Sequence, residues 1–234
     1  MFAIDHAATA LVLARRYPRV PMPALLLSVQ LAELAWVALE FAGVERTTTD
    51  STVRTVADLH LTYMPYSHSV ATVLGAALLA GAVLWVVTRR RDVSLAVALG
   101  IVSHLVLDLL THAPDLALAP GVPTPKLGVG LYSAAPWAAF LLELAYGVVC
   151  WRIYRGGRAL LATIVLFNVA NLSMFSAAIP GPEELLPSRP LLLPALVLAQ
   201  IAVTLVLTGV LARRRARETG AAPRSAAWRP PLAS

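Results

Sequence analysis

The sequence has little charge and almost no cysteine, and each shortage excludes a class of protein. Asp, Glu, Lys and Arg make up 14% of the 234 residues, whereas soluble domains contain roughly 25%. Hydrophobic residues make up 58%, too large a share for the surface of a soluble protein of this length. The single cysteine, Cys150, excludes an internal disulfide and any metal site built from several cysteines.

The apolar residues form six blocks, and crossing the hydrocarbon core of a bilayer takes roughly 20 residues per helix. The blocks are residues 24–44, 69–88, 93–112, 131–151, 159–178 and 191–212. Prolines, glycines or arginines separate them, as turn-forming and charged residues do between spans. The sequence therefore predicts an all-α, polytopic membrane helix bundle with about six transmembrane helices, in a single transmembrane domain over residues 1–217.

The two ends of the chain differ from these blocks. The apolar part of residues 2–17 is too short to span a bilayer, and arginines follow it. We expect this segment to form a half-helix that either rises part-way into the bundle or lies along the membrane interface. Residues 218–234 are rich in Ala, Pro, Arg and Ser, a composition that predicts a disordered cytoplasmic tail.

The distribution of positive charge predicts the orientation. If the N-terminus is cytoplasmic, fifteen of the 19 Lys and Arg residues fall on the inner side, and the four on the outer side are Arg46, Arg54, Lys126 and Arg189. Inner loops carry this excess in membrane proteins. We therefore expect a bacterial-type inner (plasma) membrane protein with cytoplasmic N- and C-termini. The bilayer, not nucleic acid, is the expected partner of the arginine clusters, and the sequence leaves the oligomeric state open.

Ionisable side chains occur inside the predicted spans, where each costs roughly 2.5–3.5 kcal/mol if it faces the bilayer centre. Glu33 and Glu40 are seven residues apart and share one face of the first block. His104, Asp108 and His112 recur at every fourth residue in the third block. Glu143 and the uncharged polar residues Asn168 and Asn171 also lie within predicted spans. Such groups must contact one another, water or a metal ion.

The rise per residue of an α-helix predicts the depth at which these groups meet. At a rise of 1.5 Å per residue, Glu33 and His104 each lie about 15–17 Å above the cytoplasmic ends of their spans. His6 reaches a similar depth if its helix stands upright, and His68 opens the second span at the outer boundary. We therefore expect a cavity in the outer half of the bundle, with a metal site made of His6, Glu33, His68, His104 and Asp108. Its mouth would be lined by His60, His112 and Asp115.

The His104–Asp108 spacing has a specific chemical use. Residues at i and i+4 are neighbours on a helix, so an imidazole and a carboxylate can bind one ion together. A mixed set of His, Asp and Glu suits Zn²⁺, which we expect, or Mn²⁺ or Fe²⁺ as alternatives, better than Ca²⁺ or Mg²⁺. Water bound to such a divalent metal ion becomes a nucleophile near neutral pH. Glu143 and His112 are the expected catalytic residues, which would assist with proton transfer.

Two motifs carry a family resemblance. The stretches MPYSHS at 64–69 and SHLVLDLLTHAPD at 103–115 resemble the YdjM-like family of inner-membrane proteins, a LexA-regulated group regarded as metal-dependent hydrolases. The resemblance spans about residues 1–150 and includes Tyr132 and Glu143. It implies that the family's site residues correspond to His6, Glu33, His68, His104 and Asp108. Many members carry Pro-Asp-x-Asp where this chain has Ala32 and Glu33, so one carboxylate is replaced.

Three functions remain open. The first is a membrane-embedded metal-dependent hydrolase that acts on a lipid or an envelope-derived (phospho)ester. The second is an ion-coupled or metal-ion transporter that uses the same intramembrane His, Glu and Asp residues, although the sequence lacks the internal repeat expected of many carriers. The third is a scaffold in which the polar cluster only fastens helices together. We favour the hydrolase.

Overall fold

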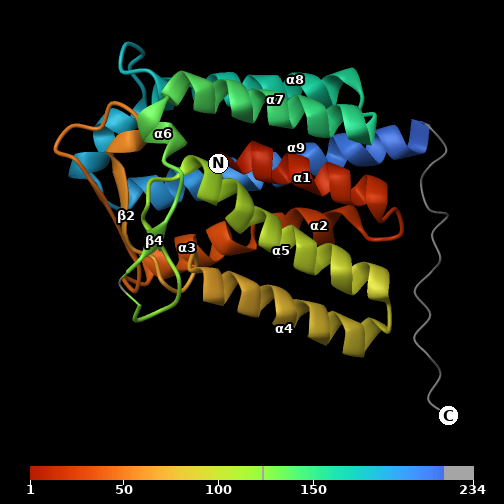
Figure 1. Cartoon of the computed structure of the whole chain (residues 1–234). Helices are drawn as coiled ribbons and strands as arrows, with labels where there is room; N and C mark the ends of the chain where they lie inside the picture. Colours follow the sequence, from red (N-terminus) through yellow and green to blue (C-terminus); the bar gives the residue numbers. More distant parts are fainter. Residues whose placement is uncertain (123, 219–234) are drawn as a thin grey trace.

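The computed structural model describes residues 1–122 and 124–218, and it is a bundle of α-helices (Figure 1). The helices are α1 Ala3–Arg16, α2 Met22–Val29, α3 Leu31–Phe41, α4 Val70–Thr88, α5 Arg91–Thr111, α6 Leu131–Ala134, α7 Pro136–Tyr154, α8 Arg158–Ala170 and α9 Leu192–Glu218. The predicted all-α membrane bundle is confirmed. The tail predicted for 218–234 lies outside the described residues, except for Glu218 at the end of α9.

Short elements connect the helices at one end of the bundle. Strands β1 (Arg46–Thr49) and β2 (Leu59–Tyr63) form an antiparallel hairpin, and β3 (Leu116–Ala117) pairs with β4 (Lys126–Leu127) in the same way. The described residues also form three 3₁₀ helices: η1 Val56–Asp58, η2 Leu172–Phe175 and η3 Pro182–Ser188. We call this end of the molecule the loop end (Figure 1).

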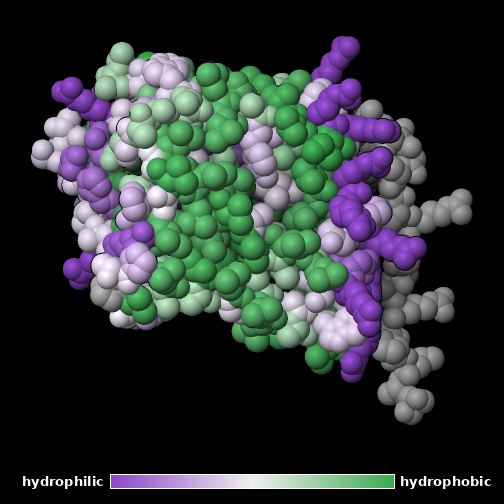
Figure 2. Space-filling view, viewed as in Figure 1, coloured by the Kyte–Doolittle hydropathy of each residue, from purple (hydrophilic) through white to green (hydrophobic). Residues whose placement is uncertain are grey.

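The outer surface of the bundle is suited to lipid. Four helices, α4, α5, α7 and α9, are long and apolar enough to cross a membrane, and α2 with α3 would make a fifth span. Leu78, Val87 and Leu166 are 76%, 74% and 64% exposed. Figure 2 shows a broad apolar belt between two hydrophilic ends. An apolar surface of this extent needs a hydrocarbon environment.

The end opposite the loop end carries arginines, and we call it the basic end (Figure 2). Here α1 ends at Arg15 and Arg16, and the α4–α5 and α7–α8 turns carry Arg89–Arg91 and Arg152, Arg155 and Arg158. This separation agrees with the charge asymmetry from which the orientation was predicted. That the basic end faces the cytoplasm stays a prediction.

Two of the predicted spans are interrupted. The first block bends by 55° between α2 and α3, at Gln30, whose buried side chain donates a hydrogen bond to the Ala3 carbonyl at 2.6 Å. The fourth block divides into α6 and α7 at Ala135, which has φ −154° and ψ 72°. Pro136 follows Ala135, and a proline disfavours helical backbone in the residue before it.

The fifth predicted block, residues 159–178, is helical only in its first part. Helix α8 has 13 residues, fewer than the roughly 20 that a complete span needs. Near its end, Asn168 and Asn171 donate side-chain hydrogen bonds to the carbonyls four residues earlier, at 3.1 and 2.8 Å. Such bonds compete with the backbone ladder of a helix. The described chain therefore has four or five spans of full length, against about six predicted.

Helix α1 lies inside the bundle, so the first of its two expected placements is correct (Figure 1). It packs against α2, α5, α7, α8 and α9. Ala7, Ala10 and Leu11 are completely buried, because small side chains let neighbouring helices approach closely. Its 14 residues cover about 21 Å from the basic end. His6 is consequently held deep within the bundle.

Candidate metal centre

The structure brings all five predicted metal ligands together. His6 comes from α1, Glu33 from α3, and His104 and Asp108 from α5, while His68 stands just before α4. Two overlapping groups have potential ligand atoms within 4.8 Å of one another, namely His6–His104–Asp108 and Glu33–His68–His104. We call these five residues the donor cluster. Only a meeting of four separate segments produces it.

Asp108 lies at the centre of the donor cluster. Its Oδ2 atom is 3.0 Å from His104 Nε2 and 3.8 Å from His68 Nε2, and its Oδ1 atom is 3.3 Å from His6 Nε2. Glu33 Oε2 lies 3.4 Å from His68 Nε2. The two Nε2 atoms of His68 and His104 are 3.3 Å apart. Nitrogen and oxygen donors thus surround one small volume.

His104 is oriented by the end of α2. Its Nδ1 atom lies 2.9 Å from the carbonyl oxygen of Val29, the last residue of that helix. A carbonyl oxygen only accepts hydrogen bonds, so Nδ1 carries a proton, and in the neutral ring Nε2 presents a lone pair to the donor cluster. Gly100, one turn before His104, permits this approach, because a Cβ atom there would collide with the side chain of Ser28.

His6 has no hydrogen-bond partner for either ring nitrogen among the described residues, although its side chain is buried. Its ring stacks on that of His104 with centroids 3.9 Å apart and an angle of 13° between the planes. A buried polar atom without a partner costs about 1–3 kcal/mol. Coordination of a metal ion by Nε2 would remove this cost at that atom, so the residues present fit such an ion.

The carboxylate of Asp108 also accepts a bond from the chain's first residue. The α-amino group of Met1 lies 2.7 Å from Asp108 Oδ1 and 3.2 Å from Thr111 Oγ1. Oδ2 remains directed at His68 and His104. Imidazole nitrogens and carboxylate oxygens in one buried site are the ligands that Zn²⁺, Mn²⁺ and Fe²⁺ accept.

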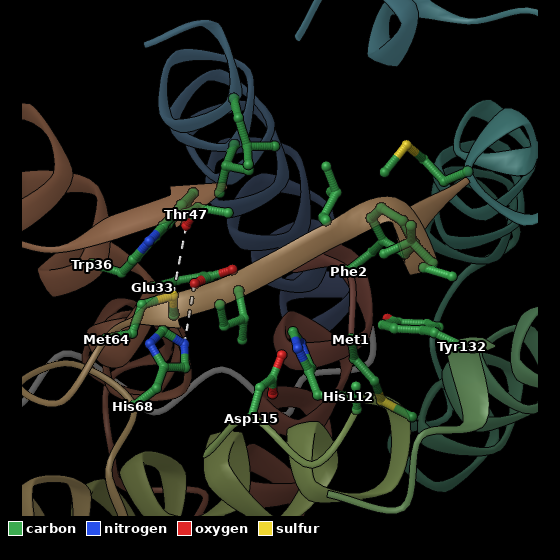
Figure 3. A pocket seen from close by; sticks show the side chains of 18 of the residues that line it. Met1, Phe2, Glu33, Trp36, Thr47, Met64, His68, His112, Asp115 and Tyr132 are labelled. Carbon is green, nitrogen blue, oxygen red and sulfur yellow. Dashed lines mark hydrogen bonds and ion pairs between the residues drawn. The ribbon is translucent and has the colours of Figure 1, made fainter. Parts of the chain in front are cut away.

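A cavity of about 120 Å³ opens onto the donor cluster from the loop end (Figure 3). Glu33, His68 and His112 lie on its floor, and its walls are mostly apolar. The wall residues include Trp36, Leu59, Leu61, Met64, Leu193, Val197, Phe2 and Met174. The side chains of Glu33 and His112 are 21% and 22% exposed, whereas that of Asp108 is 3% exposed. A ligand in the cavity would therefore meet Glu33 and His112 first.

Two of the three residues expected at the cavity mouth, His112 and Asp115, line the cavity. His112 ends α5 with its Nε2 atom 3.8 Å from Asp108 Oδ1, and Asp115 also lines the cavity (Figure 3). Burial raises the pKa of the Asp115 carboxyl to about 6. His60 is not among the lining residues, because it pairs with Asp50 at 2.9 Å on the exposed hairpin.

Glu143 lies behind the cavity wall. Its carboxylate accepts hydrogen bonds from the Tyr132 hydroxyl at 2.6 Å and from the Phe2 backbone N–H at 3.1 Å. It is completely buried, and Tyr132 separates it from the cavity. The Tyr132 ring in turn contacts His112, with centroids 5.7 Å apart. The catalytic role predicted for Glu143 would therefore act through Tyr132, and it stays a prediction, as does that of His112.

Sequence reasoning missed Ser67, which contacts His68, and Glu45, which contacts Ser67. Glu45 and Ser67 lie in a hydrogen-bonded chain behind His68. An acidic residue just after an apolar block is ordinary at the end of a span, so nothing in the sequence pointed to Glu45 as a partner of the site. Ser67 could have been identified, because it adjoins His68 in the MPYSHS motif. Glu40 accepts a bond from Trp36 at 3.2 Å and stays outside the cluster.

One comparison with known proteins gives a match. The family described as YdjM inner membrane protein matches residues 58–178, more than half of the chain. This stretch contains His68, His104 and Asp108, whereas His6 and Glu33 precede it. No curated protein and no solved structure matches. With its bundle of membrane-spanning helices and its HxxxD motif on α5, the chain belongs to the YdjM family of inner membrane proteins.

Proposed function

We propose that this chain is a membrane-embedded, metal-dependent hydrolase of a lipid or an envelope-derived (phospho)ester. The observation that carries the proposal is the donor cluster at the floor of an apolar cavity. A cluster that only fastened helices would be sealed on all sides. Here two of its members, Glu33 and His68, line a space that a small part of a substrate can enter.

The residues divide into those that would hold the ion and those that would face the substrate. His6, His68, His104, Asp108 and Glu33 supply the donors, with Zn²⁺ the expected ion and Mn²⁺ or Fe²⁺ the alternatives. A bound ion of this kind polarises a substrate oxygen and lowers the pKa of coordinated water.

Proton transfer falls to the groups that face the cavity. The imidazole of His112 can hold a proton at an atom next to the cavity. A base there can accept a proton from the attacking water and return it to the leaving group. Tyr132, held by Glu143, packs against the His112 ring and limits its movement.

The cavity walls favour a substrate with an apolar portion. Trp36 and Met64 line the cavity (Figure 3), and so do Leu193 and Val197 of α9. No Lys or Arg is among the described residues that line the cavity. Binding would therefore depend on apolar contact with the substrate and on the ion itself, as suits a lipid ester in the leaflet at the loop end.

The alternative of an ion-coupled carrier receives less support. A carrier needs a route from the ion site to each side of the membrane. Between the donor cluster and the basic end, the described bundle is filled by buried apolar side chains. These residues are Ala7, Ala10, Leu13, Leu25, Leu26, Val29, Val93 and Ala96.

The test combines metal content with turnover. Protein purified without chelator and loaded with Zn²⁺ is mixed with phospholipid vesicles, and released head groups and fatty acids are measured by mass spectrometry. We expect turnover by the wild type, none by His104→Ala, and full turnover by His60→Ala, a matched histidine on the exposed hairpin. Bound zinc without turnover of any envelope lipid, together with zinc flux into proteoliposomes, would replace the hydrolase with the carrier.

A further inference from the structure

Glu45 is a completely buried acidic residue outside the donor cluster. It follows α3, and its Oε1 atom accepts hydrogen bonds from the backbone N–H groups of Tyr66 and Ser67 at 2.8 and 2.9 Å. Its Oε2 atom accepts a bond from the Ser67 hydroxyl at 2.6 Å. The carboxylate therefore holds the turn that carries His68, and all three partners donate to it.

Ser67 connects Glu45 to His68 through a second hydrogen bond. A serine hydroxyl has one hydrogen, together with lone pairs that accept. Because that hydrogen is directed at Glu45, the Ser67 oxygen can only accept from its other neighbour, His68 Nδ1, at 2.7 Å. Nδ1 of His68 must then carry the ring proton. The neutral imidazole is left with its lone pair on Nε2.

The free lone pair of His68 points into the donor cluster. His68 Nε2 lies 3.4 Å from Glu33 Oε2 and 3.3 Å from His104 Nε2. The Val29 carbonyl imposes the same tautomer on His104. Both imidazoles are therefore set for coordination through Nε2, one by a backbone carbonyl and the other by a carboxylate acting through a hydroxyl.

We propose that Glu45 is a positioning residue, which acts through Ser67 to hold His68 in the tautomer that binds the metal ion. Partners of this kind fix the orientation and tautomer of a ligating histidine, and their loss costs 10–100-fold in metal affinity. The inference rests on the proposed metal centre for its purpose. The tautomer itself is a property of the metal-free protein and can be measured without metal or substrate.

Glu45→Gln is the sharpest variant, because it keeps the shape of the turn and reverses one hydrogen bond. The amide oxygen of glutamine can still accept from the backbone N–H groups of Tyr66 and Ser67. Its NH₂ group would replace Oε2 and donate to the Ser67 oxygen. The Ser67 hydrogen is then free to donate to His68 Nδ1, which moves the ring proton to Nε2.

The experiment records the ¹⁵N chemical shifts of His68 in metal-free, histidine-labelled protein, and then Zn²⁺ affinity by competition with a chelator. We expect the wild type to carry its proton on Nδ1 and Glu45→Gln to carry it on Nε2, with affinity about 10–100-fold lower. Ser67→Ala should also weaken binding. Ser69→Ala is the control, since it removes the cap of α4 beside His68 without entering the chain of bonds.

Two results would overturn the inference: a wild-type His68 protonated on Nε2, or a Glu45→Gln protein with unchanged tautomer and unchanged affinity. If the proposed metal centre were wrong, the experiment would give a different result. In that case the wild type would bind no Zn²⁺, while the tautomer of His68 would still change on Glu45→Gln substitution.

Discussion

His68 and His104 direct their Nε2 atoms at each other across 3.3 Å. Each ring has its Nδ1 atom engaged elsewhere, with the Ser67 hydroxyl and the Val29 carbonyl respectively. In the neutral rings both Nε2 atoms present lone pairs, which repel each other in a buried site unless a positive charge lies between them. This relationship makes the donor cluster suited to a cation.

Removal of the metal should lower stability in the wild type and not in a variant that cannot bind it. At a free Zn²⁺ concentration of 100 times Kd, binding stabilises the folded state by about 2.7 kcal/mol. We expect a chelator to lower the Tm of the wild type and to leave that of Asp108→Asn unchanged. Metal analysis by mass spectrometry should find at least one equivalent of bound ion in the wild type only. Equal chelator effects on both proteins would contradict a site at Asp108.

Gly100→Ala should disturb the donor cluster, although Gly100 is not one of its members. The new methyl group would collide with Ser28 and push α2 from α5, which costs about 1–3 kcal/mol when a packed core is overfilled. Because Val29 would move with α2, His104 would lose its carbonyl partner and Zn²⁺ affinity should fall.

Gly75→Ala is the matched control for Gly100→Ala. Gly75 lies in α4 with open space around it, and replacing a helical glycine by alanine stabilises by roughly 0.8–1 kcal/mol. Unfolding in denaturant and Zn²⁺ titration measure both variants. Similar behaviour of the two would show that the contact between Gly100 and Ser28 does not position His104.

Tyr132→Phe should destabilise the fold and leave metal content unchanged. The substitution removes the hydroxyl that donates to Glu143 at 2.6 Å and leaves a buried acceptor unsatisfied, at a cost of about 1–3 kcal/mol. Tyr63→Phe, on the exposed hairpin, should change the free energy of unfolding by much less. If Tyr132→Phe lost its metal ion, Tyr132 would have to act on the ligands themselves.

The pH dependence of stability should reveal the raised pKa of the Asp115 carboxyl. Burial raises the pKa of its carboxyl to about 6 in the folded protein, from an ordinary 3.8. Between these two pH values the folded state binds more protons than the unfolded state, so the contribution of Asp115 to stability falls as the pH rises. We expect the difference in Tm between wild type and Asp115→Asn to change over pH 4–6 and to level off above it. A constant difference across that range would show an unshifted carboxyl.

The local sequence pattern was sufficient to predict the membrane helices and part of the candidate site. Apolar blocks and arginine clusters predicted a membrane bundle, and the i, i+4 spacing predicted that His104 and Asp108 share one face of a helix. Periodicity did not predict where the blocks break. The bend at Gln30 depends on a hydrogen bond to Ala3, from a different helix, and the early end of α8 depends on side chains that turn back on their own backbone.

The sequence by itself determined which residue types are available to bind a metal ion, and it predicted how far along its helix each of them lies. Depth follows from the fixed rise of a helix, so His6, Glu33 and His104 were placed at one level before any contact was known. The tertiary structure decided which atoms face the site. The Val29 carbonyl and the Glu45–Ser67 pair select the tautomers of His104 and His68. Val29 is 75 residues from His104 along the chain, and Glu45 is 22 residues from Ser67. Hydrogen bonds between distant segments depend on packing geometry, which no local pattern encodes.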